Sequence, residues 1–150
     1  MIRVQREDFD VGTELKSLTD GNHQIGGLTS FIGLVRDIAG GQNVSAMTLE
    51  HYPGMTEKQL AAIEEEANRR WPLDASLIIH RHGRLEPGDR IVLVACASAH
   101  REAAFEACHF LIDWLKTKAP FWKLEGTPDG DNWVDSKSSD DDAAARWAKG

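Results

Sequence analysis

The chain has 150 residues, of which 41% are hydrophobic, and its 17 basic and 24 acidic residues give a net charge of -7. This length and composition predict one folded domain with at most a small appended subdomain, and exclude a disordered or fibrous chain. The acidic balance argues against broad binding to nucleic acid or to an anionic membrane, so any anion site must be local.

No stretch of the sequence approaches the roughly 20 continuous apolar residues that a membrane span needs. The first residues, MIRVQREDFD, also lack the apolar core of a signal peptide. We therefore expect a cytoplasmic protein.

The first half of the chain alternates strands with helices. Its apolar patterns predict a strand, a helix and two further strands, at residues 2–6, 8–18, 26–37 and 44–52. Thr56 is predicted to begin a longer helix, because it can cap the first turn and Gln59 completes a capping box. Pro72 ends that helix.

The second half contains the two clearest strands, at residues 75–83 and 90–98. The LEPGD segment between them has the Pro-Gly signature of a turn, so together they predict an antiparallel hairpin. A long helix follows from about residue 99 to residue 118, with Ser98 as its cap and Pro120 just past its end.

The C-terminal part mixes short apolar and acidic segments. A PFWKLEG segment and a polar turn precede an isolated Trp133-Val134, and an acidic stretch then leads into a short helix capped by one of Asp140–Asp142. This pattern predicts a main domain at residues 1–135 and an acidic C-terminal tail with a short helix at residues 136–150.

The sequence lacks the usual catalytic signatures GxxxxGKS/T, GxGxxG, GxSxG and HExxH. Cys96 and Cys108 are too few for a disulfide framework or a four-cysteine zinc site, and we expect both to be small core residues. His80 and His82 have the spacing of two metal ligands on one face of a strand, but no third ligand is evident, and we expect no metal.

His100 and Arg101 stand at the start of the long predicted helix, where the helix dipole disfavours cations by ~0.3–1 kcal/mol. A bound anion would resolve this conflict, because free backbone N–H groups beside an arginine and a histidine form a ready phosphate site. Alternatively, both side chains point into solvent or pair with Glu102 or Glu106. The residues alone leave these two interpretations about equally open.

Lys116, Lys118 and Lys123 lie close together near the other end of this helix, with Phe121 and Trp122 among them. Clustered ammonium groups lower one another's pKa and could hold an anionic intermediate beside an aromatic wall. Cations near a helix C-terminus are also ordinary, and Trp122 is equally suited to a core position.

Helix length separates the two groups of cations. About 15 helical residues at roughly 1.5 Å rise place Arg101 about 22 Å from Lys116, so the two cannot share one small-molecule site within a chain. Either the protein has two anion sites, or one site is assembled across a two-fold dimer, which we favour. Arg36, at the end of the glycine-containing strand, could grip a carboxylate or phosphate bidentately, although a lone arginine is more often a surface charge.

Several segments together resemble the large subunit of molybdopterin synthase across roughly residues 1–147. They are GGLTSFIGLVRD, LEHYPGMTEKQL, the run from IIHRHG to PFWKLE, and the DGDNWV that follows. The resemblance implies an α+β fold of the α/β hammerhead type, with antiparallel β-sheets and a small appended subdomain.

The resemblance also implies a sulfurtransferase of molybdenum cofactor biosynthesis. A central homodimer would carry a small ubiquitin-like sulfur carrier at each outer end, forming a heterotetramer of two large and two small subunits. The carrier's C-terminal thiocarboxylate would give two sulfurs in succession to cyclic pyranopterin monophosphate and form the dithiolene of molybdopterin. This subunit would then need no cofactor, no metal and no cysteine nucleophile.

Residue by residue, the family's essential lysine corresponds to Lys116, with Lys123 close by, and both would hold the thiocarboxylate and stabilise the oxyanion as sulfur leaves. Other positions match the family's substrate-binding residues, the histidine–arginine pair being contributed across the dimer: Leu34, Val35, Arg36, His100, Arg101, Leu124 and Glu125. Leu124 stands where relatives commonly have a basic residue, and a basic contribution from the tail would come from Lys137 or Arg146.

Two other classes of function compete with this interpretation. A non-catalytic dimeric module could recognise the tail of a ubiquitin-like protein through Lys116 and Lys123, without needing His100 or Arg101. A phosphometabolite enzyme acting alone would need no protein partner.

Overall fold

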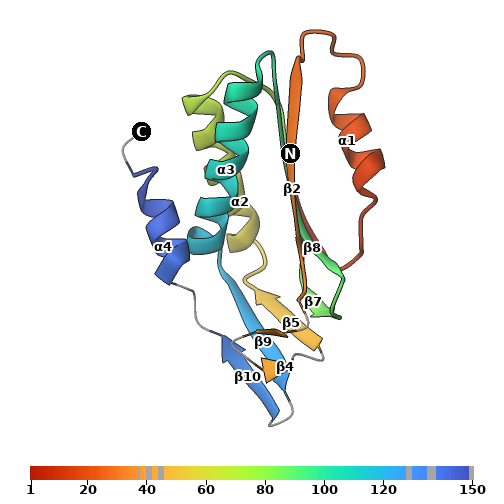
Figure 1. The fold of residues 1–150 in the computed structure, drawn as a ribbon, viewed down its shortest axis with the longest axis vertical. Helices are drawn as coiled ribbons and strands as arrows, with labels where there is room; N and C mark the ends of the chain where they lie inside the picture. Colours follow the sequence, from red (N-terminus) through yellow and green to blue (C-terminus); the bar gives the residue numbers. More distant parts are fainter. Residues whose placement is uncertain (37, 40–41, 44–45, 128–129, 135–137, 149–150) are drawn as a thin grey trace.

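The structure, a computed structural model, describes residues 1–36, 38–39, 42–43, 46–127, 130–134 and 138–148. Of these, residues 38–39, 42–43, 122–127, 130–134 and 138–139 are described by their backbone alone. Helices cover a four-stranded main sheet, and a second four-stranded sheet lies beyond one end of it (Figure 1). This arrangement confirms the α+β class.

The main sheet has the strand order β1-β6-β8-β2. These strands are, in that order, Ile2–Gln5, Leu73–Arg81, Arg90–Ser98 and Gly27–Leu34. Strands β6 and β8 pair antiparallel, which confirms the predicted hairpin, and β2 pairs antiparallel with β8. Strand β1 differs from the expected antiparallel arrangement, because it lies parallel to β6, from which much of the chain separates it.

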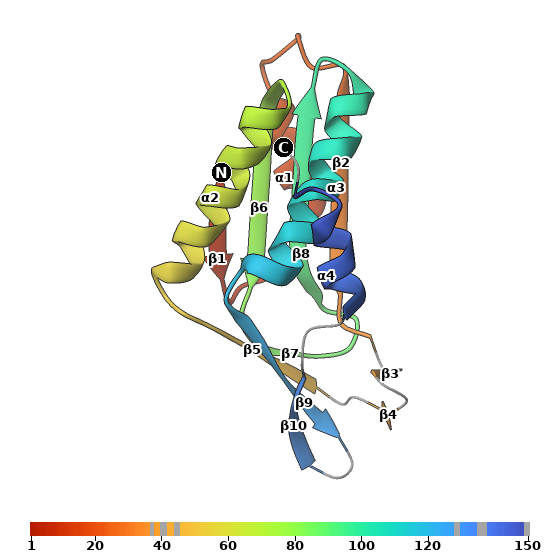
Figure 2. The same ribbon diagram turned by 90° about the vertical axis from the view of Figure 1, so that its left-hand side faces the viewer.

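Three helices cover the main sheet, α1 on one face and α2 and α3 on the other (Figures 1 and 2): Val11–Thr19, Met55–Arg70 and Arg101–Lys118. Successive residues of β8 face opposite layers, as strand geometry requires. Val94 and Cys96 belong to the cluster with α2 and α3, whereas Leu93 and Ala95 belong to the cluster with α1. The central strands are therefore buried on both sides.

The second sheet has the strand order β10-β9-β5-β7. These strands are Gly130–Val134, Phe121–Thr127, Ala46–His51 and Gly83–Leu85, and a small ladder joins β3 (Ile38–Ala39) to β4 (Gln42–Asn43). Strand β7 lies between β6 and β8 in the chain, so the predicted hairpin carries a connection into the second sheet. The Trp133-Val134 pair, expected to be isolated, belongs to β10 and pairs with β9.

Helix α2 starts one residue before the predicted Thr56. Gly54 is its N-cap with φ 86°, and the Glu57 carboxylate accepts a hydrogen bond of 2.5 Å from the Gly54 N–H. Thr56 is buried, and its hydroxyl donates to the Tyr52 carbonyl at 2.8 Å. The predicted capping box of Thr56 and Gln59 is therefore wrong, and the Glu57 carboxylate caps the N–H of Gly54.

Helix α3 starts at Arg101, and the predicted Ser98 cap is wrong. The Ser98 hydroxyl donates to the Pro72 carbonyl at 2.8 Å, and its own carbonyl accepts from the Gly26 N–H at 2.9 Å. His100 takes the N-cap position without a side-chain hydrogen bond to the helix. Backbone at the start of β2 therefore lies directly against the start of α3.

The C-terminal helix α4 (Ser138–Ala145) begins before the predicted caps and has Asp140 and Asp141 in its first turn. The indole N–H of Trp147 donates to Asp113 at 2.8 Å, and that of Trp114 donates to the Ala144 carbonyl at 3.3 Å. These bonds hold the end of the chain against α3. No helix in the described ranges is long and apolar enough to cross a bilayer.

We expect Gly26→Ala to destabilise the protein by about 1–3 kcal/mol, as overpacking does. A Cβ at this position would lie 2.2 Å from the Ala99 carbonyl oxygen, which is backbone and can move only with the start of α3. Gly12→Ala is the control, since its Cβ meets only Asp10 at 3.5 Å and should stabilise α1 by up to about 1 kcal/mol. Urea unfolding followed by tryptophan fluorescence measures both changes; equal stabilities would contradict the contact.

Candidate active site

His100 and Arg101 are exposed at the start of α3. An added Cβ at Gly27 would lie 3.3 Å from the Arg101 Cα, so β2 passes close to the helix start. Within the described residues Arg101 forms no ion pair with Glu102 or Glu106, and Glu106 instead accepts from the Trp71 indole at 3.0 Å. The exposed side chains of His100 and Arg101 thus remain available to an anion at a helix N-terminus.

An open hollow of about 410 Å³ adjoins this helix start. It is lined by Thr19, Asn22, His23, Ile25, Gly26, Gly27 and Leu28. Because Gly26 and Gly27 also contact residues Ala99 and Arg101, the hollow shares a wall with the helix start. Sequence reasoning missed His23, because nothing in its sequence neighbourhood indicates that the loop before β2 returns to this point.

Leu34, Val35 and Arg36 lie at the other end of β2. Leu34 and Arg36 are exposed, whereas Val35 is buried at 7% exposure and packs into the core. The Val35 N–H donates to the Asp89 carbonyl at 2.9 Å, and the Gly88 N–H donates to the Val35 carbonyl at 2.8 Å. The buried valine therefore fixes a backbone from which Arg36 extends.

Lys116 lies at the same end of the main sheet as Arg36. Helix α3 begins where β8 ends and packs back along β8 and β2, so its last turns reach the end of β2 that carries Leu34 (Figures 1 and 2). Lys116 is partly buried there. Lys118, two residues on, has its ammonium 4.8 Å from the centre of the Trp114 ring, a cation–π contact that gives it a structural role.

Lys123, Leu124 and Glu125 belong to β9, which starts three residues after α3 ends. Their backbones pair with β5 on one side and with β10 on the other, so they occupy the middle of the second sheet. Their side chains lie outside the described part of the structure, as does Lys137. Arg146 lies 3.8 Å from the Asp113 carboxylate, an ion pair on the helical layer.

The structure thus separates the predicted site residues into two groups. His100 and Arg101 lie at one end of the main sheet, and Arg36 and Lys116 at the other. The uninterrupted helix between them is about 22 Å long from Arg101 to Lys116, at 1.5 Å per residue. One chain therefore places the predicted site residues at two distant ends of the main sheet.

Three histidines cluster where the two sheets meet. The His51 and His82 rings are 4.4 Å apart, and His80 stacks on Phe121 at 3.7 Å. The His51 ring also hydrogen-bonds the Thr56 hydroxyl at 3.0 Å. This cluster packs against the first residue of β9.

Both cysteines are core residues, as predicted. Cys96 is fully buried and Cys108 is 3% exposed. Burial raises the pKa of the Cys108 thiol to about 11 and raises that of Cys96 further. Neither thiol can become a thiolate nucleophile at neutral pH.

A second hollow, of about 470 Å³, lies elsewhere and is lined by Met1 and by residues of β1, α1, α2 and β6. Its two cationic groups are already neutralised by ion pairs, the N-terminal amine with Glu64 and Arg3 with Glu14. It is therefore a poorer candidate for an anionic ligand than the start of α3.

Comparison with known proteins gives a consistent result along the chain. The sequence profile of the MoaE protein family matches residues 4–118. The chain belongs to the MoaE family. The molybdopterin synthase catalytic subunit of Pseudomonas aeruginosa is 57% identical over 146 residues, which cover 97% of each protein.

Solved structures of MoaE proteins agree with the fold. The Burkholderia ambifaria molybdopterin biosynthesis MoaE protein superposes with a TM-score of 0.85 at 53% identity, covering 100% of this chain and 99% of that one. A Helicobacter pylori structure, a complex of subunits 1 and 2 of molybdopterin-converting factor, superposes with a TM-score of 0.75 and covers 91% of each chain. At 17% identity this second likeness concerns the fold alone.

We expect the burial of His82 beside His51 to make stability depend on pH. Burial, and then the charges of His51 and Arg6, lower the pKa of His82 from 6.5. Because the folded protein resists protonation of His82, this contribution to stability is complete above about pH 6.5 and is lost as the pH falls. Urea unfolding measures the free energy of unfolding at pH 7.5 and at pH 5.5. Between these values His82→Gln should lose less of this free energy than the wild type, whereas His23→Gln, at an exposed position, should lose as much as the wild type. An unchanged loss in His82→Gln would contradict this assignment.

Proposed function

We propose that this chain is the catalytic subunit of a molybdopterin synthase, a sulfurtransferase of molybdenum cofactor biosynthesis. The observation that carries the proposal is the 57% identity, along nearly the whole chain, to a molybdopterin synthase catalytic subunit. The cytoplasmic location expected from the sequence stays a prediction.

The proposed reaction moves sulfur from the C-terminal thiocarboxylate of a small ubiquitin-like carrier to cyclic pyranopterin monophosphate. Two transfers in succession form the dithiolene of molybdopterin. In each, a bond forms between sulfur and a carbon of the pterin as a carbon–oxygen bond at that carbon breaks. Water cleaves the bond between sulfur and the carrier's carbonyl and leaves the carrier as its carboxylate. Two buried cysteines with raised pKa values suit a reaction in which the partner supplies the sulfur.

Lys116 and Lys123 have electrostatic roles in this proposal. Positive charges placed beside the carrier's terminal carbonyl hold the thiocarboxylate and stabilise the oxyanion that forms as sulfur leaves. The order of the elements supports these roles, since Lys116 lies in the last turn of α3 and Lys123 lies near the start of β9, which follows directly. Leu124 and Glu125 follow Lys123 in β9 and would contact the substrate next to it.

His100 and Arg101 bind the phosphate or the pterin in this proposal, and Arg36 with Leu34 and Val35 forms the second part of the substrate site. Arg101 is exposed and has no ion pair among the residues that the structure describes, so it suits an anionic group, because backbone N–H groups and the helix dipole add to its field. The guanidinium of Arg101 can bind a phosphate bidentately.

A homodimer would bring the two parts together. Strand β2 is an edge strand of the main sheet and carries three exposed large apolar side chains, Leu28, Phe31 and Leu34. Exposed edges of this kind pair with another chain. A two-fold axis beside β2 would reverse the strand in the partner, so the start of the partner's α3 would approach the Leu34 end of this chain.

The proposed assembly contains two of these subunits and two small carriers, one at each outer end. The Helicobacter pylori structure supports a two-subunit complex, since it is a complex of subunits 1 and 2 of molybdopterin-converting factor. The residues at the junction of α3 and β9, rather than the β2 edge, would then receive the carrier's tail. Homodimer contact and carrier contact would use different parts of the chain.

Reconstitution tests the proposed reaction. The purified chain, thiocarboxylated carrier and cyclic pyranopterin monophosphate should yield molybdopterin, detected after oxidation to a fluorescent derivative. Lys116→Ala should lower the rate by about 100-fold or more, as loss of an oxyanion-stabilising group does. Lys118→Ala is the matched control and should keep the wild-type rate, because its ammonium lies over Trp114.

The same assay separates the competing functions. Arg101→Ala should abolish turnover while leaving the affinity for the carrier unchanged. A binding module would show carrier binding without any product in the wild type, and a phosphometabolite enzyme acting alone would turn over substrate without the carrier. Either result would refute the proposed reaction.

Complementation tests whether the site spans two chains. Arg101→Ala and Lys116→Ala chains, each inactive alone, are mixed under conditions that exchange subunits. About half of the dimers then contain both variants and each has one intact site, so activity should return to about a quarter of the wild type. If both residues acted within one chain, every site would lack one of them and no activity would return.

A further inference from the structure

The segment that carries Arg36 is held by a turn outside its own strand. The pairing of β2 with β8 shifts register between Gly33 and Leu34, so β2 leaves the regular ladder there. Both backbone groups of the next residue, Val35, then bond to the turn at 86–89, through the Asp89 carbonyl and the Gly88 N–H. The position of Arg36 thus depends on this turn.

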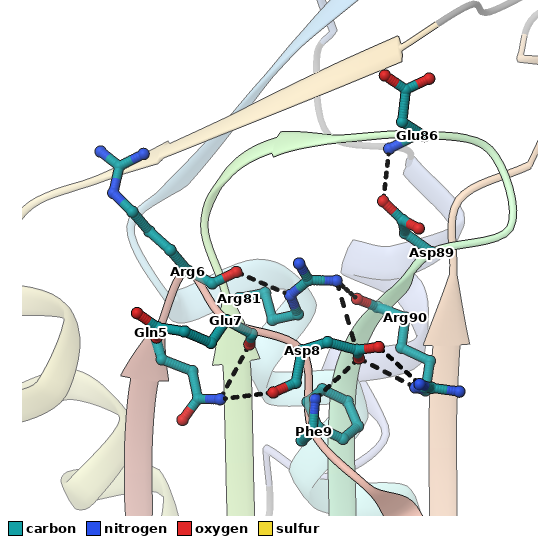
Figure 3. A network of polar contacts seen from close by, with 9 residues as sticks. All are labelled: Gln5, Arg6, Glu7, Asp8, Phe9, Arg81, Glu86, Asp89 and Arg90. Atoms are coloured by element: carbon teal, nitrogen blue, oxygen red, sulfur yellow. Dashed lines mark hydrogen bonds and ion pairs between the residues drawn. The ribbon is translucent and has the colours of Figure 1, made fainter.

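Asp89 closes the turn from both its side chain and its backbone. Its carboxylate accepts from the Glu86 N–H at 2.8 Å (Figure 3). Its own N–H donates to the Glu86 carbonyl at 3.0 Å. Gly88, with φ 91°, takes the left-handed conformation that the turn requires. The side chain of Asp89 therefore sets the conformation of the backbone that binds Val35.

Arg90 anchors this turn to the N-terminal segment. Its guanidinium donates to the Asp8 carboxylate through Nε at 3.1 Å and through Nη2 at 2.6 Å, a bidentate pair. Arg81 lies behind the pair and donates to the carbonyls of Arg90 and Arg6, each at 3.0 Å (Figure 3). The hydrogen bond from Arg90 lowers the pKa of Asp8, which keeps the carboxylate charged at neutral pH.

We infer that Asp89 and Asp8 are positioning residues for the pterin substrate: Asp89 shapes the turn, Asp8 fixes its base through Arg90, and the turn aims the segment Leu34–Arg36. The inference rests on the proposed function, which gives Arg36 its role in binding substrate. Neither aspartate touches the substrate. Their effect passes through the two backbone bonds at Val35.

The test measures kcat and KM for cyclic pyranopterin monophosphate at saturating thiocarboxylated carrier. Asp89→Ala should raise KM about tenfold or more, because a displaced binding group weakens substrate binding, with kcat and the carrier Kd within about twofold of the wild type. Asp89→Asn keeps an acceptor for the Glu86 N–H and should restore most of the affinity. Glu86→Ala is the matched control, since it removes only an exposed ion pair with Arg84 and leaves the turn's backbone bonds.

A double-mutant cycle with Arg36→Ala distinguishes positioning from a general structural role. If Asp89 acts through Arg36, Asp89→Ala should raise KM little further in the Arg36→Ala chain. The inference would be overturned if the two substitutions raised KM by independent factors that multiply in the double variant, or if Asp89→Ala had the same KM as the wild type.

Asp8→Asn provides the second variant if Asp89→Ala does not fold. It keeps an oxygen for Arg90 but loses the charge, and it should raise KM in the same direction, again without an added effect in the Arg36→Ala chain. An unchanged KM in folded Asp8→Asn would remove Asp8 from the inference. An inactive wild type would instead refute the proposed function, so the two failures are distinguishable.

Discussion

Helix α3 and the strand it follows impose the main geometric constraint on this molecule. Strand β8 ends at Ser98 and α3 begins at Arg101, so the helix must run back along the whole sheet. Its 18 residues span about 27 Å, close to the length of the nine-residue strand. Any residue at the start of the helix is therefore one sheet length away from any residue at its end, whatever the side chains do.

The cationic side chains at the start of α3 differ from those around Arg90 in whether carboxylates pair with them. At its start, Arg101 and His100 stand against the positive end of the dipole, and Arg101 has no carboxylate partner among the described residues. By contrast, Arg90 is held by Asp8 through two hydrogen bonds. Unpaired cations in an unfavourable field gain more from an anionic ligand than neutralised ones do, and this contrast favours the start of α3 as an anion site over the paired arginines of the network in Figure 3.

Sequence patterns predicted what depends on local chemistry and missed what depends on distant contacts. The hairpin of β6 and β8 and the long helix were predicted because apolar periodicity and turn residues are local. Ser98 was predicted as a cap, but its hydroxyl donates to the Pro72 carbonyl, 26 residues earlier, and the sequence cannot show this contact. For the candidate site, helix length alone predicted the separation of Arg101 from Lys116, whereas the turn that holds Val35 comes from a loop more than 50 residues away.

The chemistry of the proposed reaction explains why backbone positions matter so much in this fold. A partner that supplies the sulfur leaves the large subunit without a nucleophile of its own, and both thiols are accordingly buried. The remaining task of this chain is to place positive charge beside the carrier's terminal carbonyl. Such a charge stabilises an oxyanion best within hydrogen-bonding distance. Long cationic side chains reach such positions accurately when their backbones are fixed. The backbone beside Arg36 is fixed by the two hydrogen bonds of Val35, and the backbone of Lys116 is fixed by the last turns of α3. The main chain is therefore the rigid part that positions each of these cationic side chains.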